Sequence, residues 1–492
     1  MKFLKIVLLL SIYSTYSQEI TLTWAEKIKT KGQASLLGGM NGNYYTTHPD
    51  NDNHLVVRKY NQKMELKNEQ IVNFNLDEKK YAYMGAYFVK NKIVHFMQET
   101  KRKEDRIFLY SGTTDLDLKT SDKVLVLDEG DTDKIKSYYS FGQRRISPDS
   151  TKILIYKEYE GKKKEPNTLN FKVYDSNLTT TLLDKAAQLP IKAKNYETEN
   201  ITVDNLGNVY VLANIQKEKA EKVKDQTKFY YKLIVFGING TTKEFDFDYV
   251  TKDIESIDLI AGKNNTIICT GFLKTLGKGF LSRNKKTLIS DEYFTSTIDC
   301  NTLTLKSSKK YELEGLYPEK LKSGDYVPYK VREIFDKEDG GHVVVAEQYK
   351  LVIVQTQKST YYRYYYCDIA VIHVNNKSEV VSVSKMPKYQ LNASNPSIIS
   401  TYKNGNTYII YEDVAKNINA ENDKETKRSS GSSGSNDAMF LLTVLPSGEM
   451  KKEIIYTYKE SKIKPYLGSS RITAPGEILL NANDQIGILK IN

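Results

Sequence analysis

The densest group of side chains that could bind a ligand lies between residues 361 and 366, where five tyrosines surround one arginine. Tyrosine rings offer a large contact area at a low cost in conformational entropy, so this run could form a stacking platform for a sugar or a protein surface. In a strand, alternate rings face opposite sides, and half of them would pack inside the fold. The candidate binding residues are Tyr361, Tyr362, Arg363, Tyr364, Tyr365 and Tyr366, with plain packing as the competing interpretation.

Residues of catalytic type are scattered along the chain. Five histidines lie in different segments, and no two have the spacing of metal ligands. The sequence lacks the Gly-x-Ser-x-Gly, His-Glu-x-x-His and P-loop motifs of common hydrolases, zinc proteases and nucleotide-binding proteins. An enzyme built on this chain would have to gather its catalytic groups from distant segments, for example two carboxylates about 5 to 10 Å apart for glycoside cleavage.

Two oxygen-rich segments are candidates for a bound ion, Asp50 to Asn53 and Asp128 to Asp133. Neither completes an EF-hand loop, and turns rich in Asp and Asn explain both equally well. We therefore expect no cofactor, with calcium as the alternative. Three cysteines are too few for a disulfide scaffold and lack metal-binding spacing. We expect buried free thiols, with a bridge between Cys269 and Cys300 as the alternative.

The elements that must position these residues are short strand pairs. In Val203 to Ala213 an apolar strand, a Gly/Asn turn and a second apolar strand follow one another, and variants recur along the chain. Their first strands begin near residues 34, 83, 143, 201, 257, 332, 397 and 471, at intervals of 49 to 75 residues. Such a series is typical of a repeat architecture in which each unit packs on the next. We predict an all-β fold, a single closed β-propeller of eight four-stranded blades, or seven if one copy is not a blade.

The last copy provides the argument for closure. It holds three predicted strands, at 471–474, 477–481 and 485–491. The segment Glu19 to Trp24, before the first copy, has the pattern of a strand. An N-terminal strand that completes the C-terminal blade would close the ring and remove two exposed sheet edges. We therefore predict that this segment is the fourth strand of the last blade.

One turn resembles a known repeat. The segment Ser147 to Lys152, Ser-Pro-Asp-Ser-Thr-Lys, lies between two predicted strands, where proline fixes φ and Asp and Ser bond back to the main chain. It resembles the Ser-Pro-Asp-Gly-Lys turn of TolB-like β-propeller repeats, with Ser150 where glycine is usual. The resemblance covers this stretch alone, and it implies a fold and no activity.

The extra length of the longer repeats lies between their second and third strands, whose connections emerge on one face of a propeller. Binding residues are frequent on such loops. One of these loops, 416–437, contains the glycine- and serine-rich run Arg428 to Ser435, and we predict that 416–437 is a flexible insertion. We expect the binding surface among these loops, away from the turn within Val203 to Ala213.

The N-terminus predicts export. Lys2 and Lys5 flank the start of a short apolar run, and Thr15-Tyr16-Ser17 fits a cleavage site, so we predict a signal peptide over 1–17 and a propeller domain over 18–492. No later run reaches the roughly 20 apolar residues that a transmembrane helix needs. The net charge of +11 comes from lysines mixed with acidic residues in the same loops, which argues against nucleic acid as a partner.

These patterns favour an exported, non-catalytic binding or scaffold protein of a bacterial envelope, in the periplasm or outside the cell. Its partner would be a protein or a glycan held by loops on one propeller face, and we expect the chain alone to be a monomer. The alternative is a propeller enzyme, a glycan hydrolase or lyase, whose catalytic residues come from several blades at the central channel.

Overall fold

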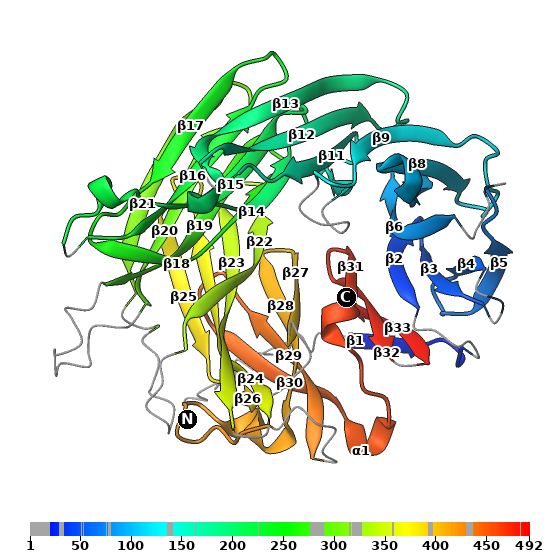
Figure 1. Cartoon of the computed structure of the whole chain (residues 1–492). Coiled ribbons are helices and arrows are strands. Elements are labelled where there is room, and N and C mark those ends of the chain that lie inside the picture. The colour runs from blue at the N-terminus through cyan, green and yellow to red at the C-terminus, as the bar shows by residue number, and fades with distance from the viewer. Residues whose placement is uncertain are drawn as a thin grey trace, which may run out of the picture.

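The computed structural model describes residues 20–28, 34–134, 141–275, 290–313, 316, 327–391, 397–429 and 436–492, except for residues 51, 53, 75, 77–79, 163, 225, 357–358 and 483. The predicted signal peptide lies outside the described residues. Within them, eight antiparallel sheets surround a common axis, so the chain forms an eight-bladed β-propeller (Figure 1). The repeat prediction is confirmed, and the seven-bladed alternative is wrong. No described helix is long and apolar enough to cross a membrane.

Each blade is a meander of four strands in chain order, except that the N-terminal strand belongs to the last blade. Blades 1 and 2 contain β2 (Ser35–Met40), β3 (Asn43–Pro49), β4 (Leu55–Tyr60), β5 (Leu66–Ile71), β6 (Tyr81–Val89), β7 (Lys92–Lys101), β8 (Arg106–Asp115) and β9 (Leu125–Asp131). Blades 3 and 4 contain β10 (Gln143–Ile146), β11 (Lys152–Tyr159), β12 (Pro166–Asp175), β13 (Thr181–Lys192), β14 (Tyr196–Val203), β15 (Val209–Gln216), β16 (Phe229–Phe236) and β17 (Thr242–Phe247).

Blades 5 and 6 contain β18 (Lys252–Ala261), β19 (Thr266–Thr275), β20 (Ser290–Asp299), β21 (Thr304–Glu312), β22 (Tyr329–Asp336), β23 (His342–Gln355), β24 (Thr360–Val374) and β25 (Val380–Met386), with the short β26 (Gln390–Leu391) beside β24. Blades 7 and 8 contain β27 (Ile398–Lys403), β28 (Asn406–Val414), β29 (Asp437–Val444), β30 (Met450–Thr457), β31 (Arg471–Ala474), β32 (Glu477–Ala482), β33 (Gln485–Ile491) and β1 (Ile20–Trp24). The first strand of each blade lies at the axis, where β31 also contacts β2 across the closing point of the ring (Figure 1).

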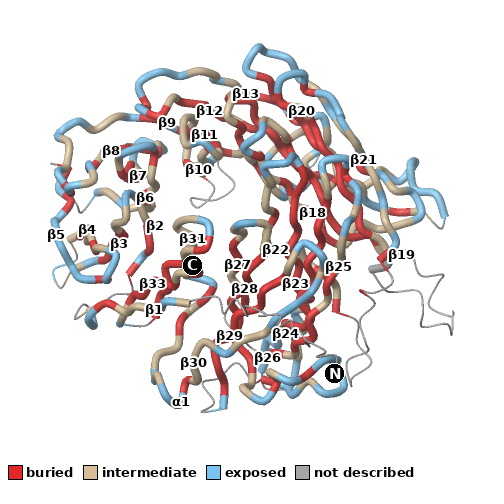
Figure 2. Tube along the Cα trace, turned by 180° about the vertical axis from the view of Figure 1, so that it is seen from behind, coloured by how far each residue is buried: buried red, intermediate tan, exposed pale blue. Residues whose placement is uncertain are grey.

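The core lies between blades, because the middle strands carry apolar residues on both faces. Strand β29 is buried along its whole length, whereas the outermost strand β5 is exposed along its whole length (Figure 2). Within Val203 to Ala213, Val209 and Val211 pack against blade 3, and Tyr210 and Leu212 pack against blade 5. Alternate side chains of one strand therefore belong to two neighbouring interfaces, as the period of two in a strand requires.

The ring closes through the N-terminal strand, as predicted. Strand β1 pairs antiparallel with β33 from Ile20 opposite Ile491 to Trp24 opposite Gly487. A Cβ atom at Gly487 would lie 2.5 Å from the Trp24 ring, so glycine is needed where the indole covers the strand. The fourth strand of blade 8 thus comes from the other end of the chain, and the edge of β33 is covered.

The turn from Ser147 to Lys152 joins β10 and β11. The Ser147 hydroxyl donates to Asp149 Oδ1 at 2.7 Å, and Asp149 Oδ1 also accepts from the Thr151 main-chain N–H at 3.0 Å. Ser150 has a φ of 56°, in the left-handed region that glycine adopts most easily. This backbone explains why glycine is usual there in the repeat that the sequence resembles.

The first part of the loop expected to be flexible, 416–437, is folded in the structure. Asn417, in a short 3-10 helix over Ala415–Asn419, donates to Asp413 Oδ1 at 2.9 Å and to the Lys427 carbonyl at 2.8 Å. Ser429 is buried, and its N–H donates to the Tyr389 carbonyl at 2.9 Å. Residues 430–435 of the Gly/Ser run lie outside the described residues, so their flexibility stays a prediction.

Candidate functional site

The tyrosine run lies inside a long strand and not in a loop. Strands β23 and β24 pair continuously from Tyr349 opposite Tyr366 to Gln355 opposite Thr360. Among the described strands, β22 pairs with β23 only up to Gln348, and β25 pairs with β24 only from Ile369. Residues 349–356 and 359–366 therefore form a two-stranded arm beyond the sheet of blade 6, and among the described strands β26 alone lies beside its base.

One face of the arm is apolar and exposed. Leu351 pairs with Tyr364 and Ile353 pairs with Tyr362, so these four side chains share a face. Ile353 is 55% exposed, Tyr362 53% and Leu351 40%, whereas Val352 and Val354, on the opposite face, are half-buried. This face, which we call the arm face, is a continuous stretch of exposed aliphatic and aromatic surface on one hairpin.

The six candidate residues divide along the strand. Tyr361 and Tyr362 are exposed, Arg363 is exposed with its guanidinium 5.2 Å from the Tyr361 ring centre, and Tyr364 and Tyr365 are half-buried. Tyr366 is fully buried and packs against Tyr349, with ring centres 5.2 Å apart. The structure therefore brings the first three residues to the surface and places the last in the core.

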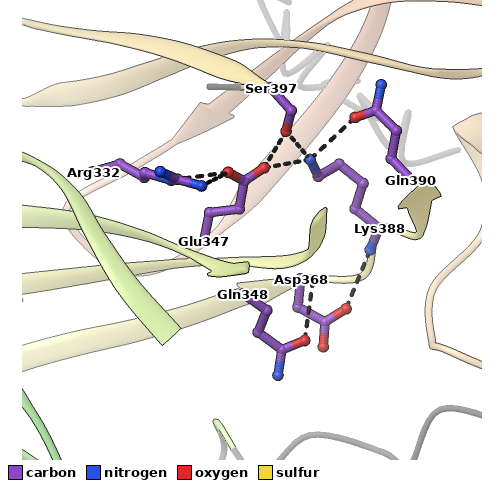
Figure 3. Close-up of polar contacts among 7 residues, drawn as sticks. All are labelled: Arg332, Glu347, Gln348, Asp368, Lys388, Gln390 and Ser397. Carbon is purple, nitrogen blue, oxygen red and sulfur yellow. Dashed lines mark hydrogen bonds and ion pairs between the residues drawn. The ribbon is translucent and has the colours of Figure 1, made fainter. Parts of the chain in front are cut away.

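A buried polar cluster anchors the base of the arm to blade 7 (Figure 3). Lys388 and Glu347 are fully buried, and Lys388 Nζ lies 2.5 Å from Glu347 Oε1 and 2.5 Å from Ser397 Oγ. The Ser397 hydroxyl also donates to Glu347 Oε1. Arg332 holds the other oxygen, with Nε 3.0 Å and Nη2 2.9 Å from Glu347 Oε2. We call these four residues the polar anchor.

Further buried groups surround the polar anchor. Asp368 accepts from the Lys388 main-chain N–H at 3.3 Å and pairs with Lys385 at 3.1 Å, while burial raises the pKa of Asp368 against the pull of that lysine. The guanidinium of Arg332 lies 5.2 Å from the Tyr349 ring centre and 5.9 Å from the Tyr366 ring centre. A buried charge is stable only where an opposite charge or hydrogen bonds compensate it. These contacts therefore hold the hairpin in one orientation.

Two cavities lie at the opposite end of the central channel, where the first and second strands of the blades are joined. The larger measures about 790 Å³ and is lined by turns of blades 5 to 8, including Asp336, Tyr402 and Pro475. The smaller measures about 410 Å³ and is lined by blades 8, 1, 2 and 3. We call the smaller one the arginine cavity, because its lining includes Arg144, Arg145 and Arg471.

Two carboxyl groups lie on neighbouring innermost strands near the channel. Asp258 on β18 accepts from Asn200 Nδ2 at 2.7 Å and from the Leu259 N–H at 2.8 Å. Burial and the charge of Asp258 raise the pKa of Glu333, on β22, to about 7. A carboxyl group with that pKa can donate and accept a proton near neutral pH.

In each segment proposed for calcium, one aspartate contacts other groups of the protein. Asp50 Oδ1 accepts from the N–H groups of Asp52 and His54, both at 2.8 Å, which is an Asx turn. Asn51 and Asn53 lie outside the described residues, so calcium there stays a prediction. In the second segment Asp128 pairs with Lys157 at 2.6 Å and with Lys172 at 3.2 Å. An ion at Asp128 would have to displace these lysines.

The three cysteines and His342 are buried. The free cysteines Cys269, Cys300 and Cys367 are all buried, and no bridge forms between Cys269 and Cys300 in the described structure. His342 is buried beside Tyr293 and Thr295, and burial lowers its pKa to about 3.

Sequence reasoning did not identify the polar anchor, the arginine cavity or the carboxyl pair. Glu347 and Lys388 are separated by 41 residues and look like other charged residues of a lysine-rich chain. The sequence held one weak signal. Glu347 directly follows the apolar run from Val343 to Ala346, and a side chain at such a position is expected to be buried and not solvated. Arg144 and Arg471 come together only because the ring closes.

Comparisons with known proteins identify no family for this chain. No family model matches the chain, and no curated protein matches its sequence. A post-proline cleaving enzyme from Rickettsia typhi is 9% identical, with a TM-score of 0.39, and the match covers 92% of this chain and 57% of that one. The Nup133 β-propeller domain of Vanderwaltozyma polyspora is 10% identical, with a TM-score of 0.37, covering 84% of this chain and all of that one. An endo-arabinanase from Bacillus licheniformis is 8% identical, with a TM-score of 0.25, covering 61% of this chain and 98% of that one.

Proposed function

We propose that the protein is a non-catalytic binding protein whose arm face docks on a protein partner. The observation that carries this proposal is the exposure of Leu351, Ile353 and Tyr362 side by side on one face of the arm. Monomeric proteins seldom expose contiguous apolar surface without a use for it. The polar anchor supports the same function, because a rigid base holds the arm ready to bind at a small entropic cost.

A protein suits this face better than a glycan. Sugar-binding surfaces combine flat rings with polar groups that hydrogen-bond to hydroxyls, whereas two of the most exposed side chains here are aliphatic. Export to the periplasm or the cell surface remains part of the proposal. N-terminal sequencing of the secreted protein should find Gln18 as the first residue if residues 1–17 are a signal peptide.

Photo-crosslinking tests the docking face. A photoreactive residue at position 362 should form a discrete protein adduct in cells, and Ile353→Ser should abolish it. The matched control is position 126 on blade 2, where Val126 is 61% exposed outside the arm. Adducts equal in amount at both positions, or insensitive to Ile353→Ser, would overturn the proposal. A glycan array tests the other class of ligand, and retention that depends on Tyr362 would assign the arm to sugars.

A second candidate function is glycan cleavage at the central channel, as a hydrolase or a lyase. It is favoured by one observation, the proximity of Asp258 to a Glu333 carboxyl whose pKa is about 7. The test is product formation from an oligosaccharide panel, with Glu333→Gln as the variant. Activity that persists unchanged in Glu333→Gln excludes this pair as the catalytic groups.

A further inference from the structure

The charged side chains described in the lining of the arginine cavity are all positive. Among the described residues that line it, three carry charged side chains, and all three are arginines: Arg144 and Arg145 on β10 and Arg471 on β31. The other lining residues are apolar, glycine, serine, threonine and tyrosine. The cavity lies at the end of the blades where the first and second strands join, and the arm extends from the opposite end. A ligand bound in the cavity is therefore independent of the proposed function of the arm.

Main-chain carbonyls fix each guanidinium in place. Arg144 donates from Nη2 to the Met84 carbonyl at 2.8 Å and from Nη1 to the Gly142 carbonyl at 3.0 Å. Arg145 donates from Nε to the Ile201 carbonyl at 3.0 Å, and Arg471 donates from Nη1 to the Leu36 carbonyl at 3.2 Å. Because a guanidinium has five N–H donors, one or two such bonds orient the group and leave donors for a ligand. Arg144 Nε is a buried donor without a partner in the described part of the chain.

No carboxylate of the described residues forms an ion pair with these arginines. Instead they contact carbonyl oxygens and aromatic rings, including Phe96 and Tyr87, whose centres lie 4.9 and 5.9 Å from the Arg144 guanidinium carbon. Asp258 interacts electrostatically with Arg145, but Asp258 does not line the cavity and is bonded to Asn200. Three cations around one space repel each other, and partial burial adds a desolvation cost for Arg144 and Arg471, so the cavity gains most from an anion.

The geometry points to a binding site for a small organic oxyanion in this cavity. We propose that a carboxylate, sulfate or phosphate group accepts hydrogen bonds from Arg144 and Arg471, which approach Tyr87 from blades 3 and 8. Planar guanidinium groups bind such oxyanions with paired, charge-assisted hydrogen bonds. A volume of about 410 Å³ exceeds the space of an inorganic ion and lies within the range of sites for small molecules. The ligand class is therefore an acidic or phosphorylated compound about the size of a sugar.

Titration calorimetry and thermal unfolding of the full chain in chloride buffer test the site. The probes are inorganic phosphate, sulfate, glucuronate and glucose 6-phosphate, with glucose as the neutral comparison. We expect saturable binding of at least one organic anion and none of glucose. Arg471→Gln should weaken that binding about tenfold or more, since it removes charge-assisted bonds. The melting temperature of this variant without ligand should change little, because the lost bond to the Leu36 carbonyl is offset by the removal of a half-buried charge that has no ion pair among the described residues.

Two further variants separate binding from general charge effects. Arg145→Gln should also weaken binding, although Arg145 is largely exposed. Arg102→Gln, in the short 3-10 helix Arg102–Glu104 between β7 and β8, removes the same charge from an exposed site outside the cavity and the arm, and should leave the affinity unchanged. Failure of every anion to bind at millimolar concentration overturns the proposal. Equal affinities in wild type, Arg471→Gln and Arg145→Gln overturn it as well, because binding would then lie elsewhere.

Discussion

Replacing Lys388 with methionine tests the polar anchor at the base of the arm. Lys388 and Glu347 are both fully buried, and the substitution leaves Glu347 Oε1 with Ser397 as its remaining partner. Breaking a buried ion pair by removing one partner costs about 3 to 5 kcal/mol. Because Arg332 still neutralises Glu347 Oε2, we expect the lower end, about 3 kcal/mol.

Denaturant unfolding followed by tryptophan fluorescence would measure this loss. For a chain of this length the entropy of unfolding is about 1 kcal/mol per degree, so the melting temperature should fall by about 3 °C. Lys451→Met is the matched control, because Lys451 pairs with Glu453 at 3.0 Å on the exposed surface and should cost under about 0.5 kcal/mol. Hydrogen exchange within 349–366 should rise in Lys388→Met only. A destabilisation below about 1 kcal/mol would refute the reasoning, since Arg332 and Ser397 would then suffice.

Two more substitutions and one deletion probe the fold. Burial raises the pKa of Asp413 to about 7, so the folded state holds a proton that the unfolded state releases, and stability should fall as pH rises from about 4 to about 7. Asp413→Asn should remove up to about 3 kcal/mol of that loss, measured as the difference in unfolding free energy between pH 5 and pH 8, and an unchanged pH slope would contradict it. Deleting residues 18–24 should expose the edge of β33 and cause oligomers visible by light scattering, whereas a stable monomer would show that β1 is dispensable. Ser150→Gly should stabilise the protein by about 0.5 to 1 kcal/mol in thermal unfolding, because φ at this residue is 56°, and a loss of stability would show that the Ser150 side chain matters more than its backbone.

The sequence predicted the blades because the information for them is local. A hairpin such as Val203 to Ala213 contains both strands and the turn between them, so its pattern can be read without knowing its neighbours. The closure by Glu19 to Trp24 was also predictable, since an incomplete last blade requires a strand from elsewhere. Blade number followed from counting these units.

The arm was harder to predict because the lengths of strands β23 and β24 depend on their pairing with each other. The run Tyr361 to Tyr366 has no polar alternation, and strand β24 continues through it because Leu351 and Ile353 on β23 lie opposite. Those two residues belong to the apolar segment Leu351 to Val354. Burial along the run then depends on distance from the sheet, so one sequence motif contains both exposed rings and a fully buried Tyr366.

The arginine cavity shows why some sites have no sequence signal at all. Arg471 belongs to the last blade and Arg144 to the third, and they share a cavity because blade 8 joins blade 1 through contacts between β31 and β2. The Arg471 guanidinium donates to Leu36 of blade 1 across this joint. A ligand held by residues from both sides of the joint would favour the closed ring. A ligand that binds only the folded state stabilises it, and the gain grows with the logarithm of the ligand concentration. Ring closure and anion binding would then be linked through the same residues.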